Sequence, residues 1–137
     1  MNYAIADTGP LVALIDKSDK DHERCVAWFK SFEGQLISTE AVLTEALYLL
    51  NLSSHAQMSC LDFFIRGIIE LRAISQSEIK IIRELMMLYQ NVPMDFADAT
   101  LVNLANQMNC FSIFTLDLKD FSIYRPKNNK YFDIYPK

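Results

Sequence analysis

Short apolar runs alternate with stretches of helical periodicity along the whole chain. The short runs suit buried strands, and turn-forming residues separate them from their neighbours. We expect strands at residues 3–6, 35–38, 68–73, 111–115 and 131–135. We expect helices at residues 9–15, 20–32, from 39 onward, 53–66, from 75–78 to about 90, and 95–108. This alternation predicts an α/β fold, a compact α/β/α sandwich around a mainly parallel central sheet.

Residues that start or stop helices support these boundaries. Pro10 is tolerated in a first helical turn, and the hydroxyl of Thr39 is a plausible N-cap. Residues 75–78, Ser-Gln-Ser-Glu, have the spacing of a capping box. Pro93 stops the helix before it, and Asn109 is the expected terminal residue of the helix that follows.

Composition narrows the class of protein. The 137 residues carry no repeat or linker, so we expect one domain over residues 1–137. No apolar run reaches the roughly 18 residues of a membrane span, and the N-terminus lacks the basic region of a signal peptide. The three cysteines are odd in number and show no C-x-x-C spacing. We therefore expect a cytoplasmic protein with reduced cysteines and no membrane partner.

The charge balance is acidic overall and basic near the C-terminus. A formal net charge of -4 argues against a protein that wraps nucleic acid by electrostatics alone. Residues 119–137 carry five basic side chains against two acidic ones. That segment could meet phosphates or be a solvated tail, and the sequence leaves both interpretations open.

Four carboxylates interrupt apolar stretches, namely Asp7, Glu45, Asp98 and Asp117. Holding an ionised carboxylate in such surroundings costs several kcal/mol unless another charge compensates it. No lysine or arginine lies directly beside any of the four in sequence. A shared divalent cation is the simplest explanation of the set.

The expected elements bring these acids to one edge of the sheet. Asp7 and Asp117 follow strands, and the carboxyl ends of parallel strands carry the site in open α/β sheets. Asp98 lies in a first helical turn that begins at the same edge. The apolar residues three and four positions from Glu45 predict a buried helix face, and they are Ala41, Val42, Tyr48 and Leu49; Glu45 joins the site if that face packs there. Each acid alone could instead partner a helix N-terminus or be partly exposed. Their occurrence on four elements favours a site.

The residue types favour a hard cation and phosphodiester chemistry. Carboxylates without histidine or cysteine partners suit Mg²⁺ or Mn²⁺ rather than zinc. His22 and His55 lie in charged and polar stretches, which indicates surface positions. A bound divalent ion lowers the pKa of water and neutralises charge on a phosphodiester. Metal-assisted phosphodiester hydrolysis is therefore the expected reaction.

Four segments in order resemble the PIN-domain ribonucleases, which include the VapC-like toxins of toxin–antitoxin pairs. They are residues 6–11 (ADTGPL), 44–47 (TEAL), 95–99 (DFADA) and 115–121 (TLDLKDF), and the likeness spans essentially the whole chain. The resemblance implies an α/β/α fold and Mg²⁺- or Mn²⁺-dependent cleavage of RNA. It also implies frequent homodimers and often an antitoxin protein as partner.

The resemblance assigns roles to individual residues. Asp7, Glu45, Asp98 and Asp117 would be the acidic catalytic residues and metal ligands. Thr8 and Thr115 would orient or hydrogen-bond the carboxylates, and Asp95 and Asp120 would be supporting acids.

Other readings of the same residues are weaker or remain open. Residues 7–9, Asp-Thr-Gly, match the triplet of aspartic proteases, but those enzymes are almost all β and rich in glycine, whereas this chain has three glycines. Dehalogenase-like phosphatases need a second aspartate where Gly9 stands. An RNA-processing nuclease without an antitoxin and a catalytically silent binding scaffold remain alternatives. The apolar segments 25–29 and 61–65 could form a dimer surface, although core packing is the favoured interpretation.

Overall fold

The computed structural model describes residues 2–137 and is built on one five-stranded sheet. Its strands are β1 (Tyr3–Ala6), β2 (Gln35–Ser38), β3 (Ile69–Leu71), β4 (Ser112–Phe114) and β5 (Asp133–Tyr135). The order across the sheet is β3-β2-β1-β4-β5, and every pairing is parallel. The expected parallel sheet is confirmed.

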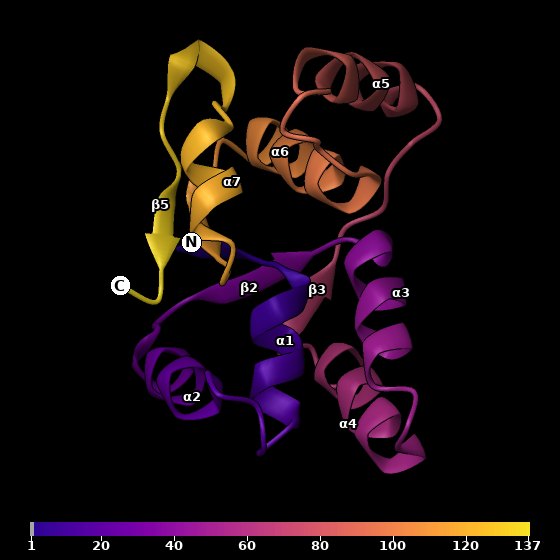
Figure 1. Ribbon diagram of the computed structural model, residues 1–137, viewed down its shortest axis with the longest axis vertical. Coiled ribbons are helices and arrows are strands. Elements are labelled where there is room, and N and C mark those ends of the chain that lie inside the picture. Colours follow the sequence, from indigo (N-terminus) through magenta and orange to yellow (C-terminus); the bar gives the residue numbers. More distant parts are fainter. Residues whose placement is uncertain (1) are drawn as a thin grey trace.

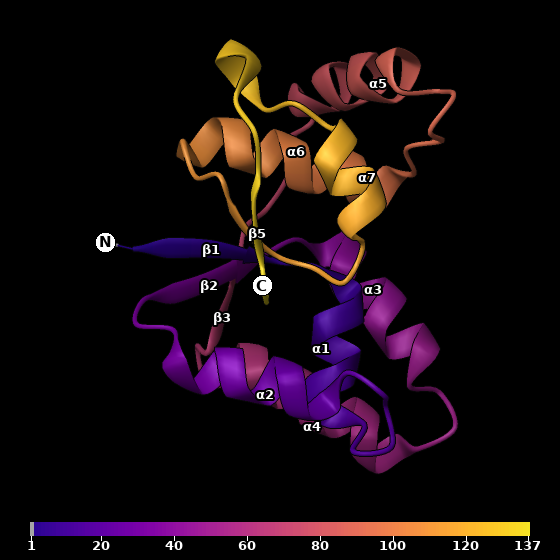
Figure 2. The same cartoon turned by 60° about the vertical axis from the view of Figure 1, so that its left-hand side comes forward.

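Helices cover both faces of this sheet. They are α1 (Thr8–Ile15), α2 (His22–Ser31), α3 (Glu40–Leu49), α4 (Ser54–Ile65), α5 (Glu78–Leu88), α6 (Phe96–Met108), α7 (Leu118–Ile123) and the 3₁₀ turn η1 (Lys127–Asn129). Helices α1 to α4 lie on one side of the sheet and α5 to α7 on the other (Figures 1 and 2). The α/β/α sandwich expected from the sequence is confirmed.

Several helix ends follow the expected local chemistry. Ser53 caps α4 by accepting a hydrogen bond from the N–H of Ala56 at 3.1 Å. The Glu78 carboxylate accepts from the N–H of Ser75 at 2.7 Å, which is one half of the expected capping box. The other half does not form, because the Ser75 hydroxyl donates to the same carboxylate and α5 begins at Glu78, with Ser77 as its N-cap residue. Asn109 ends α6 with a left-handed φ of 51°. The residue types at these positions therefore fix where the helices start and stop.

The local structure at Thr39 and at residues 118–123 differs from the sequence expectation. Thr39 is the N-cap residue of α3, but its side chain makes no capping bond. Its hydroxyl is buried and lies 2.9 Å from the hydroxyl of Thr100 on α6, so it joins two helices instead. Helix α7 was not expected, because its six residues are too few to show helical periodicity.

Helix α6 is the most deeply enclosed helix. Eight of its thirteen residues are buried, so water reaches little more than its ends. Leu101 and Val102 at its centre are fully buried and belong to the main core with strand residues such as Ile5 and Ile113. Because the core fixes α6, it also fixes the first turn, where Asp98 lies.

The apolar segments considered for a dimer surface pack mainly inward. Trp28, Phe29, Phe63 and Phe64 are partly buried and pack against the core, while Ile65 is exposed. These contacts support core packing as their main role. Cys25, Cys60 and Cys110 are buried and free. Among residues 2–137, no helix is both long and apolar enough to cross a membrane.

Gly34 allows two backbone segments to approach closely before β2. A Cβ built at this position would lie 2.2 Å from the carbonyl oxygen of Asn2 and 2.8 Å from the Phe32 ring. That carbonyl accepts a hydrogen bond from the N–H of Gln35 at 2.8 Å, at the start of the β1–β2 pairing. Any side chain at residue 34 must therefore displace backbone at the edge of the core.

We expect Gly34→Ala to lower the free energy of unfolding by about 1–3 kcal/mol, because the added carbon forces the backbone apart. Gly67→Ala is the matched control, since its φ of +74° costs about 1 kcal/mol while its Cβ meets open space. Urea denaturation of both variants measures the difference. Equal losses would contradict the close approach at Gly34.

Candidate active site

The acidic residues meet at the carboxyl edge of the sheet. Asp7 directly follows β1, and Asp117 lies three residues after the end of the neighbouring strand β4. The N–H of Asp7 donates to the carbonyl oxygen of Phe114 at 2.9 Å, which extends the pairing of the two strands to this edge. The placement expected for these two aspartates therefore agrees with the structure.

Thr115 joins Asp7 to the loop that carries Asp117. Its Oγ1 donates to Asp7 Oδ2 at 2.7 Å and accepts from the N–H of Asp117 at 3.0 Å. The other oxygen of Asp7, Oδ1, accepts from the N–H of Thr8 at 2.8 Å. Thr8 thus orients Asp7 through its backbone, while its own buried hydroxyl has no partner among residues 2–137.

Three of the acids are also helix N-caps. Asp7 caps α1, Asp95 caps α6 by accepting from the N–H of Asp98 at 2.8 Å, and Asp117 caps α7 by accepting from the N–H of Asp120 at 3.0 Å. A carboxylate at this position satisfies a free N–H and interacts favourably with the helix dipole. The alternative reading of single acids as helix partners therefore holds for these three, alongside any role in a site.

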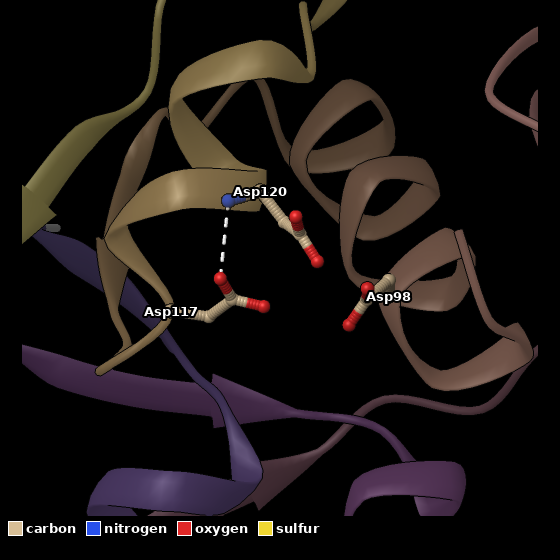
Figure 3. Close-up of side chains that lie close together, drawn as sticks. All are labelled: Asp98, Asp117 and Asp120. Atoms are coloured by element: carbon tan, nitrogen blue, oxygen red, sulfur yellow. Dashed lines mark hydrogen bonds between the residues drawn. The ribbon is translucent and has the colours of Figure 1, made fainter. Parts of the chain in front are cut away.

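Asp98, Asp117 and Asp120 form the tightest acidic group. One carboxylate oxygen from each lies within 4.8 Å of the others. Figure 3 shows Asp98 on the first turn of α6 facing Asp117 and Asp120 at the start of α7. Asp120, expected only as a supporting acid, thus stands in the cluster. The repeated Asp-x-x-Asp spacing at 95–98 and 117–120 is the sequence signal that could have placed it there.

Asp7 and Glu45 lie outside this tight group but close to it. The negative charges of Glu45 and Asp117 both act to raise the pKa of Asp7. Glu45 is half-buried on α3, but Tyr48 and Leu49 on the expected buried face are 71% and 55% exposed. That expectation was wrong for the C-terminal part of the face. The helix leaves this stretch open to solvent beside the acids.

Burial makes these acids harder to ionise. It raises the pKa of Asp7 to about 6, although the hydrogen bonds from Thr115 and Thr8 act in the opposite direction. Burial also raises the pKa of Asp98 to about 7, and the nearby charges of Asp95, Asp7 and Asp117 add to the shift. The Tyr124 hydroxyl donates to Asp98 Oδ2 at 2.8 Å and partly offsets it.

Basic side chains do not compensate this charge by direct contact. The ion pairs of residues 2–137 join Arg24 to Asp21, Arg72 to Glu70 and Lys137 to Asp133, and none includes an acid of the site. His22 is half-buried, and its Nδ1 lies 2.6 Å from the carbonyl oxygen of Ala13; His55 is exposed. The donors at the site are therefore carboxylate oxygens, the set that hard divalent cations prefer.

Comparison with known proteins places the chain in a family. The family model of the PIN domain matches residues 4–125. The chain belongs to the PIN domain family. Ribonuclease VapC26 of Mycobacterium tuberculosis, strain ATCC 25618 / H37Rv, is 29% identical over 134 residues, which cover 96% of this chain and 99% of that protein. The resemblance seen in the four sequence segments is confirmed.

Three solved structures share this fold. VapC20 of Mycobacterium tuberculosis, a toxin that cleaves the sarcin-ricin loop, has a TM-score of 0.79 at 17% identity and covers 85% of this chain and 91% of its own. VapBC2 of Rickettsia felis, bound to a promoter DNA fragment, has a TM-score of 0.68 at 18% identity, and the match covers 99% of this chain and 100% of that chain. A toxin–antitoxin complex of Klebsiella pneumoniae has a TM-score of 0.62 at 19% identity, and the match covers 87% of this chain and 90% of that chain.

The raised pKa of Asp7 predicts how the metal-free protein responds to pH. Between its ordinary value of 3.8 and about 6, the folded state keeps a proton that the unfolded state has lost. The proton on Asp7 therefore stabilises the folded state fully below about pH 4, and this stabilisation is lost as pH rises through 6. Asp7→Asn removes the titration and should remove on the order of 1–3 kcal/mol of that pH dependence.

Urea denaturation in EDTA at about pH 5 and pH 7.5 measures this effect, and comparison with the variant isolates Asp7 together with its influence on the pKa of Asp98. Asp62→Asn is the matched control, because Asp62 is an exposed aspartate on α4. It should keep the wild-type pH dependence. The same pH dependence in wild type and Asp7→Asn would contradict a raised pKa at Asp7.

Proposed function

We propose that this PIN domain is an endoribonuclease that depends on Mg²⁺ or Mn²⁺ and acts as the VapC-like toxin of a toxin–antitoxin pair. The observation that carries this proposal is the cluster of Asp98, Asp117 and Asp120 beside Asp7, at the edge of a PIN fold. The relative VapC26 is a ribonuclease, which supports RNA as the substrate. The reaction is hydrolysis of a phosphodiester bond.

The chain's own acids would hold the ion. Asp7, Glu45, Asp98 and Asp117 are the proposed catalytic ligands, and the position of Asp120 in the cluster adds it to the set. A bound divalent cation lowers the pKa of water and stabilises negative charge on a phosphodiester. The capping bond of Asp117 uses only Oδ1, and the bond from Tyr124 uses only Oδ2 of Asp98. One oxygen of Asp98 and one oxygen of Asp117 therefore have no partner among these bonds and are available to the ion, whereas both oxygens of Asp7 already accept hydrogen bonds.

Neighbouring residues keep these oxygens in place. Thr115 fixes Asp7 and the start of the α7 loop with one hydroxyl, so the two strand ends keep their spacing. The Tyr124 side chain is fully buried, and its hydroxyl holds Asp98 from the α7 side. With a pKa of about 7, the Asp98 carboxyl holds a proton in part of the metal-free molecules at neutral pH. Binding of a cation would release it.

An antitoxin protein is the proposed partner, together with a second copy of the chain in a homodimer. The structural neighbour from Klebsiella pneumoniae is a toxin–antitoxin complex, which supports an antitoxin as partner. An RNA-processing nuclease without an antitoxin is the second candidate. A small gene for a DNA-binding antitoxin beside the gene for this chain would favour the toxin, and its absence would favour the RNA-processing nuclease.

Purified protein should cleave single-stranded RNA in Mg²⁺ or Mn²⁺, and EDTA should abolish cleavage. Asp98→Asn should lower the rate at least a hundredfold, because the amide keeps the shape and the Tyr124 contact but removes the charge that holds the ion. Asp62→Asn on the exposed face of α4 should cleave as wild type does. Cleavage that persists in EDTA and in Asp98→Asn would refute the proposal, and no cleavage by folded wild type would favour a binding scaffold.

Metal binding should also be visible without any substrate. Mn²⁺ at a hundredfold excess over its Kd should stabilise the folded protein by about 2.7 kcal/mol. Asp117→Asn should lose most of this gain, because it removes a charge from the cluster, while Asp62→Asn should keep it. Thermal melting across a Mn²⁺ titration measures the effect, and an unchanged melting temperature in wild type would count against the site.

A further inference from the structure

A cavity borders the acidic site on the side of α3. Its volume is about 620 Å³, and it lies between α3 and the first turn of α6. Glu45, Tyr48, Asp95 and Phe96 line it, so one wall belongs to the proposed active site. Cavities of this size hold small molecules or parts of larger ligands.

The apolar lining of this cavity includes two exposed aromatic rings. Tyr48 lies one turn after Glu45 and is 71% exposed, and Phe96 directly follows Asp95 and is 45% exposed. Phe96 also lines two neighbouring hollows, one against α5 and one toward the end of β3. A large aromatic side chain at the start of a buried helix would normally be covered. These two rings remain accessible to a ligand beside the catalytic acids.

The charge of the cavity selects the part of an RNA that it can hold. Glu40, Glu45 and Asp95 line it, and no lysine or arginine does. A phosphate would be repelled by these carboxylates, whereas a neutral planar base would not. The net charge of -4 gives RNA no overall electrostatic attraction to the protein, and the basic segment 119–137 does not line this cavity. Stacking of bases on aromatic faces is the sequence-tolerant alternative.

We infer that Tyr48 and Phe96 form a stacking subsite for one unpaired base of single-stranded RNA. This inference rests on the proposed ribonuclease function and adds how the substrate is positioned. Because Glu45 and Asp95 lie in the same cavity as the rings, a base held there places an adjacent phosphodiester beside the acidic cluster. Tyr48 and Phe96 are therefore positioning residues for RNA rather than catalytic ones.

A fluorescent RNA tests the subsite directly. The probe is a short oligouridine with one central 2-aminopurine, whose fluorescence falls when the base stacks on an aromatic ring. In EDTA, where no cleavage occurs, wild-type protein should quench it. Phe96→Leu and Tyr48→Leu keep apolar volume but remove the aromatic face, and each should weaken binding roughly tenfold. Phe96→Trp and Tyr48→Phe should quench as wild type does.

Tyr131→Leu is the matched control, because Tyr131 is 69% exposed but does not line the cavity. It should bind and quench normally. Cleavage kinetics in Mn²⁺ give a second measurement, in which the Leu variants should raise KM more than they lower kcat. The difference in KM between wild type and Phe96→Leu should become smaller when the stacked nucleotide of the RNA is made abasic.

Three results would overturn the subsite. Absence of quenching by wild type, or equal quenching by wild type and both Leu variants, would show that no base stacks there. Conversion of a wild-type dimer to monomers by the Leu variants, seen by sedimentation velocity, would assign this face to a second copy of the chain. Failure of the nuclease proposal is separate, since it shows as wild-type protein that cleaves no RNA.

Discussion

A single buried hydroxyl connects the acidic site to the sheet. Thr115 donates to Asp7, a bond that crosses from the end of β4 to the end of β1, and accepts from the backbone N–H of Asp117 within the loop after β4. Because β1 and β4 are neighbours in the sheet, these two bonds together fix the spacing of Asp7 and Asp117. The start of α7, and with it Asp120, depends on the same contact. The rest of the site is arranged around it.

The site combines stabilising and destabilising roles in the same side chains. As N-caps, Asp7, Asp95 and Asp117 each stabilise a helix that begins at the carboxyl edge. Burial and mutual repulsion act against this gain, as the raised pKa values of Asp7 and Asp98 show. The capping bonds allow the fold to tolerate an acidic cluster without a cation. A divalent ion would relieve the repulsion that remains, which links stability to function.

The sequence predicted the sheet and most helices because their apolar periods and cap residues are strong local signals. The sequence could not predict α7, because six residues are too few to show helical periodicity. Asp120 was therefore expected only as a supporting acid, although it lies in the acidic cluster. The sequence also assigned Thr39 a capping hydroxyl, whereas a partner on α6, 61 residues away, takes that bond. The exposure of Tyr48 depends on which helices end beside α3, and this is a tertiary property that no local pattern contains.

We propose that the buried, mutually repelling carboxylates of Asp7 and Asp98 hold protons near neutral pH and that a divalent cation displaces these protons. Calorimetric titration with Mn²⁺, in buffers of different ionisation enthalpy, measures protons released per bound ion. Because the pKa values of Asp7 and Asp98 are about 6 and about 7, release should be clear near pH 6 and nearly absent near pH 9. Binding of Mn²⁺ with no proton release at either pH would contradict the claim.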